Sequence, residues 1–272
     1  MEYLSFYKTV GGNEGLKCKH STRLDTYGCG CSHDCKYCYA KSLLSFRGLW
    51  NPEDPASADI RKVRKKVGKI PKEIIRLGGM TDCFQPVEKT RRVTYETIKA
   101  LNENRVPYLI VTKSAMVADP EYLEILDKDL AHVQITVTTT DDDKSLTYEK
   151  ASVPSERIKA IEKLYDAGID VQLRLSPYIE SFVDTDVIND VRCDKMLVEF
   201  LRCNHWIQKW FDLDYSKYTH KENGYRHLEL EEKVRLLEPL KKRVTVCEDC
   251  TDHYEYWREH VNPNKEDCCD LR

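Results

Sequence analysis

Strand and helix signals alternate along the middle of this 272-residue chain, and this alternation restricts its fold more than any other feature. Short apolar runs typical of buried strands are separated by longer amphipathic segments. The expected strands cover 24–27, 74–77, 108–112, 133–137, 171–175 and 243–246, and the expected helices cover 87–102, 120–130 and 154–167. Repeated βα units build a parallel sheet with right-handed crossovers. About six strands favour an α/β fold with a partial (β/α)6 barrel of TIM type over a closed barrel.

The chain is long enough for one sizeable hydrophobic core. We expect the barrel core over residues 1–180. Residues 181–272 are expected to form a mainly helical C-terminal region that carries the last strand and a cysteine-rich tail, with 184–242 helical and irregular. Ligands bind beyond the carboxyl ends of parallel strands, so the residues that follow each strand are the site candidates.

Three cysteines within eight residues, Cys31, Cys35 and Cys38, have the spacing C-x3-C-x2-C. Three thiolates can hold three irons of a [4Fe–4S] cube and leave the fourth iron open to a ligand. A zinc site is the alternative, but zinc sites usually need a second Cys/His pair, which Cys29 and His33 would have to supply. The spacing therefore favours the cluster.

With Tyr37 directly before the last cysteine, the segment 28–40 resembles the radical S-adenosylmethionine (SAM) enzymes. In that superfamily the open iron takes the amino and carboxylate groups of SAM, and one electron splits SAM into methionine and a 5′-deoxyadenosyl radical. The resemblance implies a [4Fe–4S] cluster and SAM as cofactors, and Tyr37 as a catalytic residue. It also implies a one-electron donor such as flavodoxin or ferredoxin.

Four more stretches resemble the spore photoproduct lyase-like branch of that superfamily. They cover 78–88, 111–114, 136–140 and 173–178, and each lies at the end of a predicted strand. The resemblance implies that seven residues bind SAM: Gly78, Gly79, Asp82, Lys113, Thr139, Arg174 and Ser176.

The residue types agree with these roles. Glycines 78 and 79 let the backbone approach a ligand closely, with Asp82 beside them. Lys113 is a compact cation suited to the methionine carboxylate. The hydroxyls of Thr139 and Ser176 suit the ribose or carboxylate, and Arg174 adds charge. A strand-end turn or helix cap is the alternative for each residue taken singly.

The lyases of this branch carry, in the motif that matches 78–82, a cysteine that returns a hydrogen atom to the product radical. Gly79 stands at that place here, and Cys83 is the nearest thiol. Cys83 is therefore our candidate for this catalytic role, and a reaction other than thymine-dimer repair is favoured.

A second group of cysteines lies near the C-terminus: Cys247, Cys250, Cys268 and Cys269. Four soft ligands can hold zinc or an auxiliary iron–sulfur cluster. The alternative is free thiols in a mobile tail, because two contiguous cysteines chelate one metal with difficulty. Cys18, Cys193 and Cys203 are expected to be isolated and buried.

Composition bears on location and partners. The sequence has no apolar run near 18 residues and no leader pattern at its start, so we expect a cytoplasmic protein without a membrane contact. A net charge of −3 gives no general attraction to nucleic acid. The basic run 61–69, continued by Lys72, can contact phosphates, although a solvated helix face is the commoner meaning of such a run.

The aromatic-rich segment 206–225 can cover the barrel mouth and stack on a planar base, with helix packing as the alternative. Hydrogen abstraction from a nucleobase or nucleic acid, for repair, rearrangement or modification, is therefore the favoured function. One alternative is a radical step on a peptide or small metabolite, with an auxiliary metal site. The other is a non-catalytic iron–sulfur or zinc protein that binds nucleic acid, but such a protein needs no SAM pocket.

Overall fold

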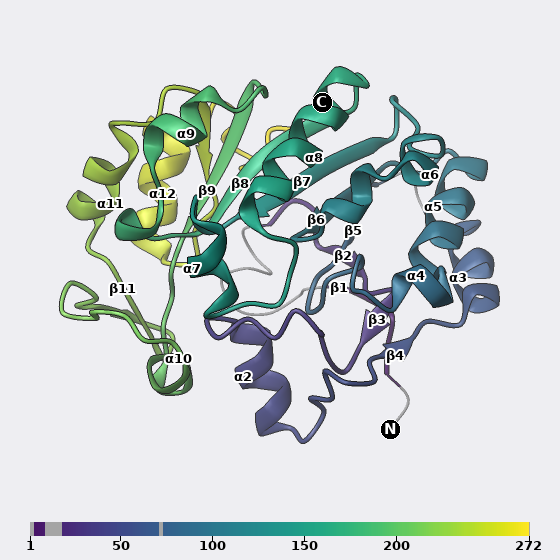
Figure 1. Ribbon diagram of the computed structural model, residues 1–272, viewed down its shortest axis with the longest axis horizontal. Helices are drawn as coiled ribbons and strands as arrows, with labels where there is room; N and C mark the ends of the chain where they lie inside the picture. The colour runs from purple at the N-terminus through teal and green to yellow at the C-terminus, as the bar shows by residue number, and fades with distance from the viewer. Residues whose placement is uncertain (1–2, 9–17, 71–72, 272) are drawn as a thin grey trace.

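The computed structural model describes residues 3–8, 18–70 and 73–271, and a single large sheet runs through it (Figure 1). The strand order is β1-β2-β5-β6-β7-β8-β9-β12. Their bounds are Phe6–Lys8 (β1), Thr22–Leu24 (β2), Ile75–Leu77 (β5), Tyr108–Thr112 (β6), Ala131–Val137 (β7), Asp170–Tyr178 (β8), Lys195–Phe200 (β9) and Arg243–Val246 (β12). All neighbours from β2 to β12 are parallel, whereas β1 is antiparallel to β2. Because the spatial order follows the chain order, the α/β partial barrel expected from the sequence is confirmed.

Helices cover the outside of this sheet. In Figure 1 α3, α5 and α6 lie at one end of the molecule and α9, α11 and α12 at the other. The α-helices are Tyr39–Phe46 (α2), Ile60–Val67 (α3), Glu88–Arg91 (α4), Val93–Glu103 (α5), Pro120–Leu123 (α6), Asp142–Leu146 (α7), Pro154–Asp166 (α8), Thr185–Asp190 (α9), His205–Trp210 (α10), Leu230–Leu237 (α11) and Thr251–His260 (α12). Short 3-10 helices cover Ala115–Ala118 (η1) and Glu180–Phe182 (η2), and two small antiparallel ladders pair Tyr27–Gly28 (β3) with Ala56–Ser57 (β4) and His220–Glu222 (β10) with Tyr225–His227 (β11).

Local sequence explains several of these boundaries. The expected helix over 154–167 is present as α8, which starts at Pro154 and stops before Gly168, whose φ of 75° favours glycine. The expected helix over 87–102 is divided into α4 and α5, because Arg92 between them has a left-handed backbone with φ 53°. All seven residues of β7 are buried, as expected for a central parallel strand.

Strand β9 corrects the expectation that 184–242 is mainly helical. It pairs in parallel with β8 on one side and β12 on the other, so the sheet has seven parallel strands rather than about six. The sequence pattern did not predict β9, because charged residues interrupt its apolar run. The Lys195 ammonium reaches the Asp170 carboxylate at 2.8 Å, and the Glu199 carboxylate pairs with Arg174, so both charges are compensated inside the barrel.

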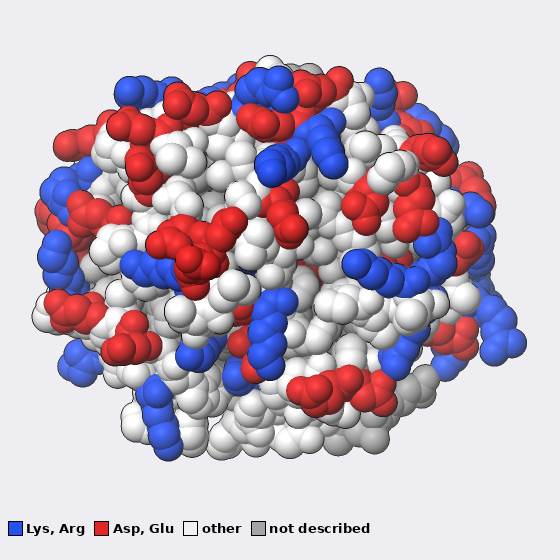
Figure 2. All heavy atoms as spheres, in the orientation of Figure 1, with Lys and Arg blue, Asp and Glu red and all other residues white. Residues whose placement is uncertain are grey.

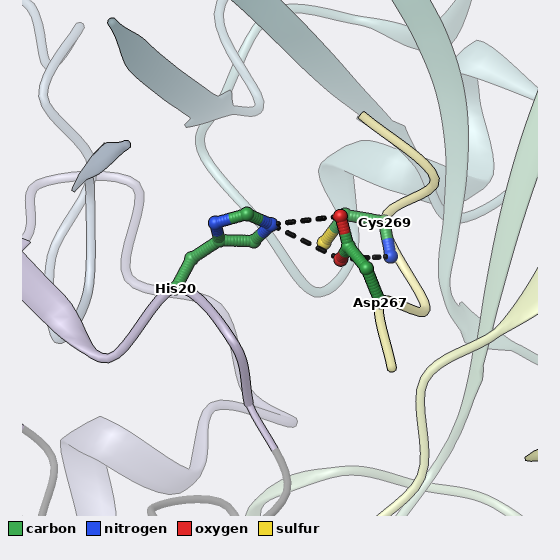
Figure 3. A group of neighbouring side chains, drawn as sticks. All are labelled: His20, Asp267 and Cys269. Atoms are coloured by element: carbon green, nitrogen blue, oxygen red, sulfur yellow. Dashed lines mark hydrogen bonds and ion pairs between the residues drawn. The ribbon is translucent and has the colours of Figure 1, made fainter. Parts of the chain in front are cut away.

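The C-terminal tail joins the two ends of the open sheet. His20, just before β2, places Nε2 3.0 Å from both carboxylate oxygens of Asp267 (Figure 3). Farther along the tail, the Lys195 ammonium donates to the Asp270 carbonyl, and Arg243 of β12 pairs with the Asp270 carboxylate. Residues 267–271 therefore lie across the seam between the first and last parallel strands.

None of the helices in the described ranges is long and apolar enough to cross a membrane.

Candidate active site

The three cysteines of the C-x3-C-x2-C run line one cavity of about 140 Å³ beyond the carboxyl ends of the strands. The loop that carries them follows β3 and packs tightly. A Cβ on Gly30 would lie 1.9 Å from the Asn51 carbonyl oxygen, and Asn51 N–H donates to the Cys29 carbonyl at 2.7 Å. Cys38 forms the N-cap of α2. The loop thus holds all three thiols toward the same space.

The surroundings of the thiols suit a thiolate-bound cluster. Burial raises the pKa of Cys31 to about 12 and that of Cys35 well above its usual value. The backbone N–H groups of Asp82 and His33 hydrogen-bond to Cys31, and the Lys113 cation opposes the rise for Cys35. Hydrogen bonds and positive charge of this kind stabilise cysteine sulfurs that ligate iron. The donor set and its setting fit a [4Fe–4S] cluster.

A glycine turn after β5 forms the next wall of the cavity. Gly78 has φ 82°, and a Cβ there would lie 2.7 Å from the Val111 carbonyl oxygen. The Gly79 N–H donates to the Asp25 carboxylate at 2.6 Å, and Met80 N–H bonds the same group. Asp25 is buried, which raises its pKa to about 6, although the hydrogen bonds from Gly79 and Met80 oppose the rise. The turn is therefore tied to the segment before the cysteine loop.

Asp82 lines the cavity but is already fully engaged. One carboxylate oxygen accepts from Phe84 N–H and the Thr112 hydroxyl, and the other accepts from Lys113 N–H at 2.7 Å. Burial raises its pKa, but the neighbouring His33 and the backbone donors outweigh burial, and the pKa falls to about 2. Asp82 thus joins the ends of β5 and β6 to the cysteine loop rather than offering a free carboxylate.

Lys113 also lines the cavity. Its Nζ lies 5.6 Å from the centre of the Tyr37 ring. Within the part of the chain that the structure describes, its ammonium has no hydrogen-bonding or ion-pair partner. A cation without a hydrogen-bonded partner at this place is available to an incoming carboxylate.

Arg174 and Ser176, both on β8, share one partner in the cavity, Glu199 of β9. The Arg174 guanidinium donates to the Glu199 carboxylate at 2.5 Å and to the Gln134 side chain at 2.7 Å, and the Ser176 hydroxyl donates to Glu199 at 2.6 Å. Burial raises the pKa of Glu199, but Arg174 and Ser176 outweigh it and hold the pKa at about 2. Glu199 is therefore an ionised acceptor that faces the cavity.

Three residues predicted for the barrel site lie outside the cavity lining: Tyr37, Thr139 and Cys83. The Thr139 hydroxyl donates to the Phe182 carbonyl at 2.6 Å and accepts from Asp141 N–H, so it stabilises a loop. Cys83 is 1% exposed and packs in the hydrophobic core. Burial raises the pKa of its thiol well above the usual value, so the group is a neutral core residue in this structure.

Tyr37 lies behind the cluster loop. Its hydroxyl donates to Glu149, which is buried with Arg157, and its ring meets the Tyr148 and Phe211 rings edge to face at 5.8 and 5.7 Å. Phe211 comes from the aromatic-rich segment 206–225. Part of that segment therefore packs in the core behind the cysteines, as the helix-packing interpretation expected.

Helix α10, near the start of that segment, is partly exposed. It packs against α2, which starts directly after Cys38. Trp206 on α10 is 44% exposed, and Phe46 on α2 is 83% exposed. Lys41 of α2 places its ammonium 5.2 Å from the Trp210 ring. These two helices therefore offer exposed aromatic side chains.

The C-terminal cysteines separate into two places. Cys247 lines the cavity, and Cys247 and Cys268 pack with Cys269 in one small hydrophobic cluster. Cys250 instead lies with His227 and Glu248, or with His220 and Glu222, in a second group of side chains. The set of four cysteines expected from spacing is therefore not brought together.

The basic run over 61–69 is mostly helix α3. Val63 and Val67 are buried against α5, and Arg64 pairs with Glu96 at 2.7 Å and with Glu103 at 2.9 Å. These contacts agree with a solvated helix face. Lys72, which continues the run, lies outside the described residues.

Sequence reasoning missed three residues that shape the site: Asp25, His33 and Glu199. Glu199 was missed because β9, the strand that carries it, was not predicted. Asp25 directly follows β2, and a carboxylate at a strand end was a signal that could have identified it. His33 lies inside the cysteine run and was considered only as a zinc ligand, whereas its ring meets Asp82 at 3.4 Å.

Comparisons with known proteins agree with this geometry. The family model described as "Radical SAM superfamily" matches residues 26–189. An uncharacterized protein of Methanocaldococcus jannaschii is 28% identical over 171 residues, which cover 58% of this chain and 61% of that protein. An uncharacterized protein of Mycobacterium tuberculosis is 23% identical over 167 residues, covering 57% and 49%. The match thus spans less than two thirds of the length of these relatives.

Two solved structures share the fold. A spore photoproduct lyase variant with bound AdoMet and dinucleoside spore photoproduct superposes with a TM-score of 0.56 and 15% identity, covering 91% of this chain and 76% of that one. Streptococcus suis SuiB bound to its precursor peptide SuiA gives a TM-score of 0.55 and 14% identity, covering 86% and 50%. At these identities the likeness concerns the fold alone.

Proposed function

Because the chain belongs to the radical SAM superfamily, we propose that Cys31, Cys35 and Cys38 hold its [4Fe–4S] cluster and that its substrate is a nucleobase or nucleic acid. When bound, the cluster supplies the electron that splits SAM into methionine and the 5′-deoxyadenosyl radical, which abstracts hydrogen from the substrate. A one-electron donor of the flavodoxin or ferredoxin type reduces the cluster. One observation carries this proposal: the three thiols, the glycine turn and the Lys113 side chain line the same cavity.

Each wall of the cavity has a role in binding SAM. The turn at Gly78 and Gly79 brings backbone close enough to receive the methionine ammonium. Lys113 binds the methionine carboxylate. Glu199, oriented by Arg174 and Ser176, accepts hydrogen bonds from the ribose hydroxyls. Tyr37 and the rings around it exclude water from the far side of the cysteine loop.

A nucleobase substrate is supported by two features near the cavity. The exposed rings of Trp206 on α10 and Phe46 on α2, two helices that pack together, offer surfaces on which a base can stack. A hollow of about 400 Å³ adjoins the cavity at His33, which lines both. Four lysines line this hollow, Lys89, Lys150, Lys159 and Lys163, together with two acidic residues, Asp119 and Glu156. Such a group can bind phosphate at short range.

The charge distribution over the surface favours binding of a few nucleotides over binding of a long duplex. In Figure 2, lysine and arginine side chains alternate with acidic ones over the visible face and form no continuous basic band. The net charge of −3 agrees with this mixture. We therefore expect recognition of a nucleoside or a few nucleotides rather than of an extended helix.

A radical step on a peptide or small metabolite is the second candidate. The thiol of Cys247 in the same cavity favours it, since a thiolate-bound metal there would lie beside the substrate. Steep salt dependence of oligonucleotide binding supports the first candidate, and its absence supports the second.

The decisive experiment is anaerobic. The protein is reconstituted with iron and sulfide, reduced with dithionite and given SAM, and 5′-deoxyadenosine is measured beside a Cys35→Ala variant. We expect formation in the wild type and loss in the variant. A fully loaded cluster that yields no deoxyadenosine with oligonucleotides, peptides or nucleosides present would refute the catalytic proposal.

A further inference from the structure

Three cysteines from two distant parts of the chain pack together inside the barrel, apart from the C-x3-C-x2-C loop, and a fourth lies near them. Cys247 and Cys268 pack against Cys269 in a small cluster with Leu109 and Leu197. Cys18, which sequence analysis expected to be isolated, lies within electrostatic range of Cys247 and Cys269. All four are free thiols. We propose that these four cysteines form a second, thiolate-bound metal site, for zinc or an auxiliary iron–sulfur cluster.

The tail is held so that its two contiguous cysteines face this site. The Asp267 carboxylate contacts His20 Nε2 at 3.0 Å and accepts from the backbone N–H groups of Cys269 and Leu271 (Figure 3). His20, Asp267 and Cys269 also bring their ligand atoms within 4.8 Å of one another. Because every oxygen of Asp267 is already hydrogen-bonded, this pair acts as a clamp for the tail, and the thiols remain the donors.

Cys268 and Cys269 can both bind the metal although they are adjacent in the sequence. Both tail cysteines belong to the same small cluster of packed side chains, together with Cys247, so their side chains reach the same place. Cys269 is buried, and it packs with the fully buried Leu109 and Leu197. Apolar packing of this kind excludes solvent from the Cys269 side of the site.

Positive charge surrounds the thiols, as a buried group of thiolates requires. The Arg23 guanidinium lies 3.4 Å from the Cys18 sulfur. Arg174, which is buried, interacts with Cys247 and Cys269 as well as with Glu199. A four-thiolate zinc or iron–sulfur site carries net negative charge, and these guanidiniums compensate it inside the protein.

The position of this site connects it to the first cavity. Cys247 and Arg174 both line the cavity that holds Cys31, Cys35 and Cys38. A metal bound by Cys247 therefore lies at the inner wall of the proposed SAM pocket, where it can contact a substrate. The ligand set also excludes Cys250, whose neighbours are histidines and glutamates of another group.

The test measures metal content without using activity. The full chain with Cys31, Cys35 and Cys38 all replaced by alanine is loaded either with zinc or, anaerobically, with iron and sulfide. Zinc, iron and acid-labile sulfide are then counted per chain. We expect the loaded protein to keep about one zinc ion, or one iron–sulfur cluster, per chain. Cobalt(II) substitution checks thiolate ligation, because it gives intense sulfur-to-metal charge-transfer absorption. The two loadings distinguish zinc from iron.

Further substitutions in this background identify the ligands. Adding Cys247→Ala or Cys268→Ala should lower metal occupancy about tenfold or more, in line with loss of a ligand. Cys250→Ala is the matched control and should keep the metal. Circular dichroism and thermal unfolding of each variant separate ligand loss from unfolding, and Cys18→Ser gives a second, conservative variant.

Two results would overturn the proposal. One is a folded triple variant that holds no metal after either loading, and the other is a Cys250→Ala protein that loses as much metal as Cys268→Ala. Neither depends on SAM cleavage, so failure of the proposed function and failure of this site are distinguishable.

Discussion

The carboxylate of Asp25 accepts a 2.6 Å hydrogen bond from the backbone N–H of Gly79. Asp25 lies between β2 and the cysteine loop, and Gly79 lies in the turn after β5, so one contact joins two walls of the proposed SAM pocket. The contact also depends on glycine. A Cβ at position 79 would come within 2.1 Å of the Tyr7 hydroxyl oxygen, which itself bonds Asp25.

Titration of Asp25 should lower the free energy of unfolding as pH rises. Its pKa is raised by burial from 3.8 to about 6 in the folded protein. Between these values the folded state keeps a proton that the unfolded state has lost, so the free energy of unfolding decreases with increasing pH. Relative to Asp25→Asn, which cannot titrate, the wild type should lose about 1 kcal/mol between about pH 5 and about pH 7. Urea unfolding of both apo proteins across this range measures the difference, and parallel pH profiles would contradict it.

Lys113→Met should weaken SAM binding without loss of the cluster. The substitution removes the cation that we assign to the methionine carboxylate, and a charged hydrogen bond of this kind corresponds to about tenfold to hundredfold in Kd. Calorimetric titration of reconstituted protein with SAM measures the change. Lys150→Met is the matched control, because this exposed lysine adjoins the cysteine loop through its backbone bond to His33 but does not line the cavity. Equal affinities for the two variants would rule out the assigned role.

Glu149→Gln should destabilise the fold strongly. Glu149 and Arg157 form a fully buried ion pair, and Glu149 also binds the Tyr37 and Thr138 hydroxyls. Removing the carboxylate leaves the Arg157 charge uncompensated, which costs about 3–5 kcal/mol. Denaturant unfolding at neutral pH measures the loss. The pKa of Glu149 is lowered, because Arg157, Lys113 and Tyr37 outweigh burial. The contribution is therefore present above the usual glutamate pKa and is lost as pH falls below it.

The exposed Glu156 supplies the control for that experiment, since it lies on α8 one residue before Arg157. Glu156→Gln should change the free energy of unfolding by less than about 0.5 kcal/mol. Similar losses for the two glutamates would show that the buried pair is not the cause.

Reversal of charge at Lys159 and Lys163 should weaken oligonucleotide binding if the lysine-lined hollow receives phosphates. We expect the double variant Lys159→Glu and Lys163→Glu to lower affinity about tenfold at low salt and to flatten the dependence of log K on log salt. Fluorescence anisotropy with a short thymine-containing single strand measures both quantities. Arg61→Glu on α3, away from the cavity lining, should have little effect. An unchanged salt slope in the double variant would place the phosphates elsewhere.

The alternating strands and helices, the cysteine spacing and the strand-end motifs could all be predicted from the sequence, because each depends on neighbours close in the chain. The carboxyl ends of parallel strands lie at one edge of the sheet regardless of loop conformation. For this reason the strand-end residues Gly78, Lys113 and Arg174 line one cavity with the three cysteines Cys31, Cys35 and Cys38.

Other features depend on partners that no local pattern contains. Strand β9 carries two charged residues whose burial costs free energy unless each is paired. Lys195 pairs with Asp170, and Glu199 pairs with Arg174, both from the neighbouring strand. Spacing alone grouped Cys250 with Cys247. The start of α12 instead places Cys250 beside Glu248 and histidines, and a tail clamped by His20 and Asp267 brings Cys18 into the thiol group.

The sequence by itself thus determined the chemistry that the chain can carry, because ligand spacing and residue type are properties of short segments. Only the tertiary structure decided which side chains share a site and which are engaged elsewhere. Asp82, Thr139 and Cys83 show the difference. All three follow strand ends in the sequence, yet hydrogen bonds or burial in the folded chain already satisfy them. Desolvation and pairing are properties of the packed interior, and packing is set by contacts between distant residues.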